Sequence, residues 1–447
     1  MKTPRLLLRF LTVGGLVLLL LVPLMMIRGA ISERQMFRAQ AVARVTQSAA
    51  GAQRLVGPLR IISWTDSQPV QLIDDKGVKR RRIDKTTDQI VQTPLALTID
   101  GNLVPGTRLI GLHEVRVYEW HAKLKATFGS DLPEPPANVT REYAAPYLVF
   151  GLADVRGLVG TPNLRIDGGS ARLLPGAGPL AQRFTGVHVL LPATTGTDNI
   201  GKRIAGNRID LDFALAGTES LSIAPIADSN RIALTSSWPH PLFGGRFLPR
   251  TRTVNDKGFN ARWDISSLAS DAQSQLRRGA GLTGDSALDS LQVDLVDPVN
   301  VYSQAERATK YGILFIVLTF VGFALFELIK HLPIHPLQYL LVGLALAIFF
   351  LLLLSLSEHI PFWQAYAVSA AACIGLQGFY LSHVLLSRRR ALGFAAMLTA
   401  LYGVLYGLLV SEDNALLMGS LLLFGILAAV MWITRKVDWY ALGATLR

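Results

Sequence analysis

The fold is decided by YGILFIVLTFVGFALFELI at residues 311–329 and LQYLLVGLALAIFFLLLLSL at residues 337–356, two apolar runs joined by a short loop. Each run has about the 20 residues that an α-helix needs to cross a bilayer. Four further runs have this character, and they occupy residues 10–27, 362–386, 391–410 and 415–434. The sequence therefore predicts a six-helix transmembrane bundle, with five of the helices in residues 310–434.

The charges of the loops predict the orientation of this bundle. Short loops rich in Lys and Arg are retained in the cytoplasm. Basic residues occupy alternate loops, and the opposite loops carry Glu358 with His359 and Glu412 with Asp413. We therefore expect cytoplasmic termini, at residues 1–9 and 435–447. The basic residues are Lys2, Arg5, Arg9, Lys330, Arg388, Arg389, Arg390, Arg435 and Lys436.

The first apolar run also has features of a cleavable signal peptide. A charged start followed by an apolar stretch is common to signal peptides and signal anchors. This run is longer than a usual signal-peptide core, and no small-x-small cleavage site follows it. We therefore predict that residues 10–27 form an uncleaved signal anchor and that residues 28–309 form a domain exported to the periplasm.

Composition narrows the class of partner for this domain. The chain carries a net charge of +12, but the basic residues are spread along it and do not form a patch. A dispersed excess indicates a solvated surface, so we expect no nucleic-acid partner. The single cysteine, Cys373, lies in an apolar run, so the exported domain depends on its hydrophobic core and not on disulfides.

Within the exported domain the hydrophobic period changes from helical to alternating. Residues 31–56 predict a helix that is ended by Gly57 and Pro58. Short alternating runs follow, with turns expected at residues 74–77 and at Asp100-Gly101, and a surface loop at residues 266–284. This pattern predicts an antiparallel β-sandwich. The expected strands are residues 59–65, 70–73, 78–83, 95–99, 109–120, 147–152, 155–158, 164–166, 187–191, 209–215, 222–225, 231–237 and 260–265.

Several long blocks of the chain resemble the CreD family of inner-membrane proteins. The blocks are RLIGLHEVRVY (108–118), SWPHPLFGGRFLP (237–249), GFNARWDIS (258–266), VDPVNVYSQAERATKYGILFIVLTFVGFALFE (296–327) and HPLQYLLVGLALAIFFLLLLSLSEHI (335–360). The resemblance implies a multi-pass inner-membrane protein of Gram-negative bacteria. It also implies links to colicin E2 tolerance, to cell-envelope integrity and to a two-component regulon, with no established catalytic activity.

One candidate site in the exported domain is the loop around Trp238 and His240, with Phe243 and Trp263 expected nearby. An exposed aromatic loop of this kind would grip a sugar or peptide of the envelope, and the alternative is that it closes one end of the sandwich. We favour closure of the core, because aromatic side chains dominate core packing.

A second candidate is the pair Glu358 and His359, where the third crossing leaves the membrane. The two residues form either an acid–base pair or an interfacial anchor beside Trp363 and Tyr366. Adjacent residues on a helix point about 100° apart, which argues against one shared site.

No motif in the chain predicts a cofactor or a metal. Gly279, Gly281 and Gly284 spell G-x-G-x-x-G outside the strand-to-helix context that gives this motif meaning. Glu327, His331 and His335 are spaced four apart, but prolines interrupt the helix that would align them. We therefore expect a non-enzymatic protein of the envelope whose partners are the bilayer and an envelope component. The alternative is a membrane enzyme or a lipid transporter acting at the periplasmic leaflet.

Overall fold

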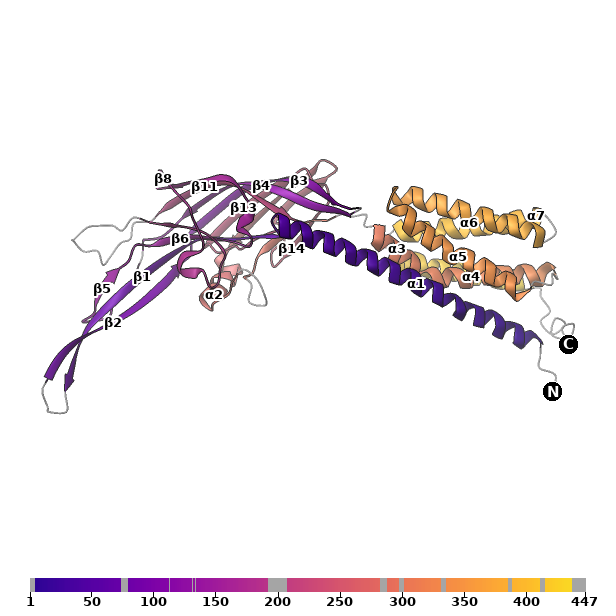
Figure 1. Ribbon diagram of the computed structural model, residues 1–447, viewed down its shortest axis with the longest axis horizontal. Helices are drawn as coiled ribbons and strands as arrows, with labels where there is room; N and C mark the ends of the chain where they lie inside the picture. The colour runs from indigo at the N-terminus through magenta and orange to yellow at the C-terminus, as the bar shows by residue number, and fades with distance from the viewer. Residues whose placement is uncertain are drawn as a thin grey trace. The chain divides into compact units, whose positions relative to one another are not determined.

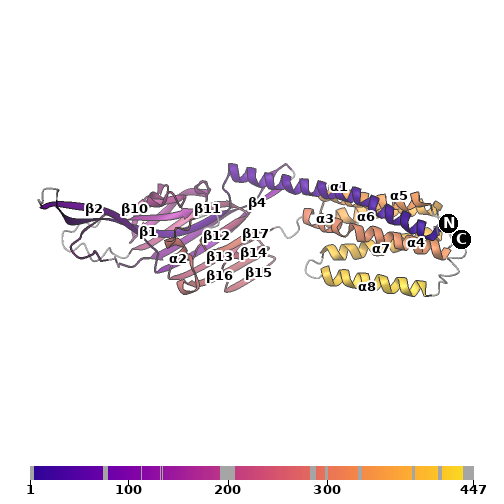
Figure 2. The same cartoon turned by 90° about the horizontal axis from the view of Figure 1, so that it is seen from below.

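The computed structural model describes two units (Figures 1 and 2). The helical unit comprises Met1–Arg38 and Val299–Arg447, and the β domain comprises Ala39–Pro298. The described residues are 5–73, 79–111, 113–130, 132, 134–191, 207–281, 288–296, 301–330, 335–384, 388–410 and 415–435. The turn predicted at residues 74–77 lies outside them.

Helix α1 (Arg5–Ser48) is continuous and contributes residues to both units. In the β domain its last turns place Ala41 and Val45 against Val115. The Arg156 guanidinium donates to the carbonyls of Thr46 and Gln47, which caps the C-terminus of α1. The same guanidinium holds the pKa of Asp154 below its usual value, mainly by hydrogen bonding.

The predicted end of this helix at residue 56 is wrong. The helix ends at Ser48, and strand β1 (Gln53–Ile73) begins five residues later and runs through Gly57-Pro58. Residues at the start of β1 pair with strand β12 on one side and β6 on the other. These ladder hydrogen bonds, together with burial of Leu55 and Val56, outweigh the helical periodicity of the segment.

The helical unit contains α1 and six further helices. Among the described residues, α1, α5, α6 and α7 are each long and apolar enough to cross a membrane. Helices α3 and α4 are bent by 44° at their junction and together would provide a fifth span, and α8 contains a shorter apolar segment. The apolar helices are confirmed, and the count of six crossings remains a prediction. The bounds are α3 (Val301–Lys310), α4 (Gly312–Lys330), α5 (Pro336–Ser357), α6 (Phe362–Val384), α7 (Arg388–Val410) and α8 (Ala415–Thr434).

The β domain has two sheets around one core (Figure 1). Sheet A follows the order β14-β17-β12-β1-β6-β10-β9, with β2 and β5 also paired to β1, and sheet B follows β15-β16-β13-β3-β4-β11-β7-β8. The further bounds are β2 (Lys79–Gln92), β3 (Ala96–Ile110), β4 (His113–Thr127), β5 (Thr140–Tyr143), β6 (Tyr147–Leu152), β7 (Leu158–Ile166), β8 (Gly169–Ala171), β9 (Leu174–Pro175), β10 (Gly186–Leu190), β11 (Arg208–Thr218), β12 (Ser220–Ile223), β13 (Ser229–Ser236), β14 (Pro241–Gly245), β15 (Thr251–Asn255), β16 (Gly258–Ser266) and β17 (Leu291–Leu295).

The β-rich class is confirmed, but the sheets are mixed and not purely antiparallel. Strand β12 runs parallel to β1, and strand β13 runs parallel to β3. In both cases the paired strands are far apart in sequence, so no local turn signal reports the direction of pairing.

Three local predictions in the β domain are also wrong. No turn forms at Asp100-Gly101, because β3 continues to Ile110. Residues 155–157 form a short 3-10 helix in place of a strand. The predicted loop after residue 266 contains helix α2 (Ala272–Arg277), which buries Ala272 and Leu276 in the core. Burial of two apolar side chains explains why this polar stretch is ordered.

Candidate functional site

The aromatic loop of the β domain lies against the core. The Trp238 indole nitrogen donates to the carbonyls of His240 and Val296, at 3.1 and 3.2 Å. The Arg116 guanidinium lies over the Trp238 ring at 4.6 Å from its centroid. Hydrogen bonds therefore fix the N–H edge of the indole, and the guanidinium fixes its face. The ring packs beside the hydrophobic core.

Trp263 lies deeper than Trp238, and Phe243 packs against it. Trp263 is 1% exposed, its indole nitrogen donates to the Phe247 carbonyl, and its ring contacts Phe243 edge to face at 5.9 Å. Of the four predicted residues only His240 is exposed, with its ring 6.1 Å from that of Trp238. The structure brings the four residues together in two pairs that close the core.

Glu358 and His359 point to different partners. Glu358 follows the last turn of α5, and its carboxylate is 3.3 Å from the Arg34 Nε and 3.5 Å from the Tyr302 hydroxyl. His359 is exposed, and its Nδ1 lies 3.2 Å from the Ser355 carbonyl of its own helix. The two side chains therefore do not share a site.

Two more polar contacts join α1 to α3 near Glu358. Gln35 donates to the Glu306 carboxylate at 3.2 Å, and Arg28 donates to the Thr309 carbonyl at 3.4 Å. Together with Arg34, Tyr302 and Glu358, these residues form what we call the polar clamp. The clamp fixes α1 against α3 and α5 through charge-assisted hydrogen bonds. Of these residues, only Glu358 was a candidate from sequence, because it stands at the end of an apolar run.

One of the two aromatic residues expected beside Glu358 differs from the prediction. Trp363 is exposed, as an interfacial anchor would be, but Tyr366 is buried in the helical unit and its hydroxyl donates to the Tyr402 carbonyl. Four-residue spacing from the buried Phe362 places Tyr366 on the interior face of α6. Near the other end of the unit, Glu327 accepts from the Tyr339 hydroxyl.

The polar clamp predicts energetic coupling between Arg34 and Glu358. Glu358 is only 8% exposed, so removal of Arg34 leaves a largely buried carboxylate without its cation. We expect Arg34→Met and Glu358→Gln each to lower thermal stability of the protein in detergent, with a coupling energy of about 1 to 2 kcal/mol in a double-mutant cycle.

The matched control for this cycle is Arg278→Met. Arg278 and Asp271 form an ion pair of the β domain, outside the polar clamp, and both side chains are more than half exposed, so its loss should cost less than about 0.5 kcal/mol. Additive effects of the Arg34 and Glu358 substitutions would contradict a coupled clamp.

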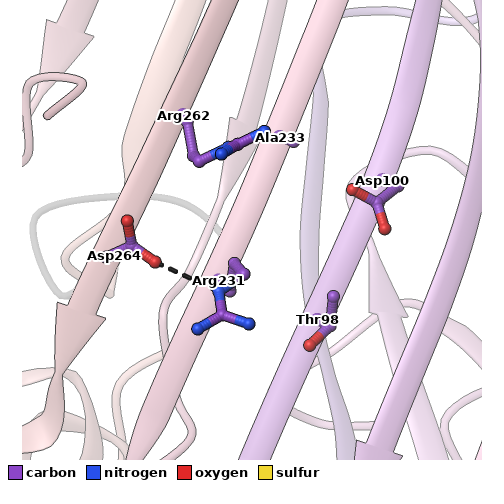
Figure 3. Close-up of a pocket in the computed structure, with 6 residues that line it drawn as sticks. All are labelled: Thr98, Asp100, Arg231, Ala233, Arg262 and Asp264. Carbon is purple, nitrogen blue, oxygen red and sulfur yellow. Dashed lines mark hydrogen bonds and ion pairs between the residues drawn. The ribbon is translucent and has the colours of Figure 1, made fainter. Parts of the chain in front are cut away.

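The outward face of sheet B carries a second candidate site, which sequence reasoning missed. A hollow of about 490 Å³ lies on β3, β13 and β16. It is lined by six residues, which are labelled in Figure 3: Thr98, Asp100, Arg231, Ala233, Arg262 and Asp264. Arg231 pairs with Asp264 at 3.3 Å. Ala233 lies between Arg262 and Asp100 in the strand register, and its small side chain leaves space between longer ones.

Charges of both signs continue from this hollow across β4, β11 and β7. The register places Asp100 beside Lys123 and Lys123 beside Asp212, and it places Lys125 beside Asp210. A second hollow of about 310 Å³ lies among these residues. We call the whole set the charged belt, and it consists of Asp100, Lys123, Lys125, Arg165, Asp210, Asp212, Arg231, Arg262 and Asp264. Charged residues alternate with apolar ones along each of these strands, which predicts that they share one face of their strand. The order of the strands in the sheet, which brings them together, cannot be predicted from this alternation.

The described parts of the chain contain no cluster of metal-binding residues. Among those residues no group of three or more His, Cys, Asp or Glu side chains has the arrangement to hold a metal ion. His335 instead accepts from the Leu337 amide and caps the N-terminus of α5, while His331 lies outside the described residues.

Several helices long and apolar enough to cross a membrane, together with a large two-sheet domain, are consistent with a multi-pass membrane protein that carries a β domain. The chain belongs to the CreD family, since the family described as "Inner membrane protein CreD" matches residues 5–440. A relative of that name from Escherichia coli (strain K12) is 38% identical over 431 residues, which is 96% of this chain and 92% of the relative.

Solved structures give a much weaker likeness. Two structures of an M1 zinc metallopeptidase from Deinococcus radiodurans match 45% of this chain and 42% and 41% of their own chains. Both have a TM-score of 0.22, with 11% and 12% sequence identity, so the likeness supports no inference about this protein.

Proposed function

We propose that this inner-membrane protein supports cell-envelope integrity and the envelope stress response without catalysing a reaction. In this proposal residues 28–309 are periplasmic, both termini are cytoplasmic, and the charged belt contacts an envelope component. The alternating basic loops support the orientation, because such loops are retained in the cytoplasm.

The hollow at Ala233 carries the proposal of a contact surface. Two guanidinium groups and two carboxylates surround one small residue on an open sheet face. Asp100 and Asp264 would repel a purely anionic polymer, and Arg231 and Arg262 would repel a purely cationic one. The complementary partner is an envelope peptide that carries both ammonium and carboxylate groups.

Helix α1 supports a role for this contact in signalling. One continuous helix contributes to the β domain, where Arg156 caps it, and to the helical unit, where the polar clamp holds it. A helix that is fixed by side chains in both units transmits displacement better than a flexible linker does.

The alternative of a membrane enzyme or lipid transporter depends on Glu358 and His359. Joint acid–base work requires both side chains to reach one substrate. Glu358 is engaged by Arg34 and Tyr302, whereas His359 lies by Ser355. This separation favours the non-enzymatic proposal.

Photo-crosslinking tests the contact surface in living cells. With p-benzoylphenylalanine at Ala233, we expect a specific adduct to an envelope peptide, identified by mass spectrometry. Reversal of charge through Arg231→Glu and Arg262→Glu should reduce the adduct by about tenfold or more, because like charges across an interface cost several kcal/mol.

The matched control places the same photo-crosslinker at Val254, an exposed position on β15 outside the charged belt. We expect no specific adduct from Val254. Adducts at Ala233 that contain only this chain, or that are insensitive to charge reversal, would remove the support for the charged belt as the contact surface.

A further inference from the structure

Helix α6 carries a buried polar stripe in an otherwise apolar helix. Ser369, Cys373 and Gln377 are spaced four residues apart, so they lie on one face of the helix. None of the three is more than 4% exposed. Cys373 is eleven residues from either end of α6 (Phe362–Val384), which places the stripe at the middle of the helix.

Helices α5 and α7 complete the surroundings of the stripe. The Cys373 thiol donates to the Ala345 carbonyl of α5 at 2.9 Å, and the Gln377 amide nitrogen is 3.8 Å from the Cys373 sulfur. From α7, the Tyr402 hydroxyl lies beside the same sulfur. Tyr402 is 2% exposed, so α5, α6 and α7 all contribute polar groups around the buried Cys373 sulfur.

Several of these polar groups lack a partner within the described chain. The Ser369 hydroxyl, the Gln377 side-chain oxygen and the Tyr402 hydroxyl make no hydrogen bond to another described nitrogen or oxygen atom. Buried polar atoms are nearly always hydrogen-bonded, and they are more costly in a bilayer, where lipid offers no donor or acceptor. The Tyr402 hydroxyl has only the weakly accepting Cys373 sulfur beside it, and the Ser369 and Gln377 oxygens have no partner among the described residues, so these atoms call for guests that both donate and accept.

The side chains of the stripe indicate that the bound molecule is small and uncharged. Its side chains are an amide, two hydroxyls and a thiol, with no carboxylate, Lys or Arg among them. A neutral site does not compensate a buried ion. Water satisfies two to four buried polar groups at once and is the usual bridge in such places.

We propose that α5, α6 and α7 enclose a hydrated polar site at mid-depth of the helical unit, with water bound by Ser369, Gln377 and Tyr402. The site gives the apolar unit one internal point that exchanges with solvent, and Cys373 lies in its wall.

The native cysteine supplies a direct test, because Cys373 is the only cysteine in the chain. A thiol reacts through its thiolate, which forms only where water reaches the sulfur. The experiment measures alkylation of the full-length protein by N-ethylmaleimide in native membrane vesicles. The labelling of denatured protein defines the maximum extent of alkylation. We expect complete labelling in the folded protein at a rate well below that of the denatured protein.

Two variants separate hydration from general loosening of the fold. Gln377→Met keeps the side-chain length and removes the polar groups, so we expect the labelling rate to fall by about tenfold while thermal stability is kept or raised. Tyr402→Phe removes only a hydroxyl and should lower the rate by a smaller factor. Thr399→Val is the control on α7, because Thr399 is exposed and bonds its own helix.

Either of two results would overturn the proposal. The first is absence of labelling in the folded wild-type protein, which would mean that the stripe is dry. The second is a labelling rate that Gln377→Met and Tyr402→Phe leave unchanged, which would mean that the reagent arrives by local unfolding. Both results are independent of the charged belt, since the test uses only residues of the helical unit.

Discussion

Replacement of Arg60 by methionine is expected to unfold the β domain, with a loss of about 3 to 5 kcal/mol in its free energy of unfolding. Arg60 lies on β1 and is 0% exposed. Methionine keeps the apolar stem of the side chain and removes its five donors. The expected result is a β domain that is degraded in cells and that melts far below the wild-type protein when purified.

The size of this effect follows from the groups that Arg60 satisfies. Its guanidinium donates to the Gln92 side-chain oxygen at 2.7 Å, to the Asn207 side-chain oxygen at 2.9 Å, and to the Gly129 carbonyl. It also lies over the Phe128 ring at 5.0 Å. Without Arg60, three half-buried oxygens lose this donor, and a lost hydrogen bond to a charged donor costs about 1.5 to 3 kcal/mol where water replaces it poorly.

Arg60 remains charged at neutral pH in spite of its burial. Desolvation lowers the pKa of its guanidinium to about 10, and attraction to Asp167 acts in the opposite direction. Asp167 accepts from the Asn207 amide, so Asn207 connects the carboxylate to the cation. The charge is thus balanced through one intervening side chain.

A change at an exposed arginine is the control for Arg60. Arg231→Met removes an arginine of β13 whose side chain is 70% exposed and forms a surface pair with Asp264. Its loss should change stability by less than about 1 kcal/mol. Comparable melting of the Arg60 and Arg231 variants would show that the Arg60 network contributes little to the fold.

The contrast between Arg60 and Arg231 shows that secondary structure can be predicted from the sequence, whereas the burial of a charged residue cannot. The apolar helices and most strands were predicted, because hydrophobic periodicity depends only on neighbouring residues. Arg60 stands in the alternating sequence of β1 without any sign that it is buried. Its partners Gly129 and Asn207 are 69 and 147 residues away, so only the folded chain defines the network.

The candidate sites show the same limit: single residues can be recognised in the sequence, but their distant partners cannot. Glu358 was singled out from its position at the end of an apolar run, but its partner Arg34 comes from the first helix, more than 300 residues earlier. The aromatic residues expected near Trp238 form two pairs, Trp238 with His240 and Phe243 with Trp263. The charged belt required the strand order of sheet B, in which β13 is inserted beside β3 by a parallel pairing.

Gly101→Ala is expected to have the second-largest effect, a loss of about 3 kcal/mol in the free energy of unfolding of the β domain. A Cβ atom at this position would overlap the Trp120 indole nitrogen and would lie 3.0 Å from Trp120 Cε2. Trp120 is fully buried and packs edge to face on Phe213 at 5.3 Å, so the indole has little space to move. Chemical denaturation of the purified protein would measure the loss.

This glycine also explains why no turn forms at Asp100-Gly101. Asp-Gly is a strong signal for a tight turn when only local sequence is considered. In β3 the glycine is an ordinary strand residue that pairs with Ala122, and its missing side chain is replaced by the indole of Trp120. Cross-strand packing of an aromatic ring on glycine compensates for the weak strand propensity of glycine.

Two further variants make the Gly101 prediction specific. Gly244→Ala is the control, because Gly244 is also a strand residue and a Cβ there meets nothing within 4 Å; its effect should stay within about 0.5 kcal/mol. Trp120→Leu makes room above Gly101, so Gly101→Ala should cost at least about 1.5 kcal/mol less in that background than in the wild type. If the cost of Gly101→Ala is the same with and without Trp120, contact with the indole is not its cause, and the loss of backbone freedom at Gly101 must be considered in its place.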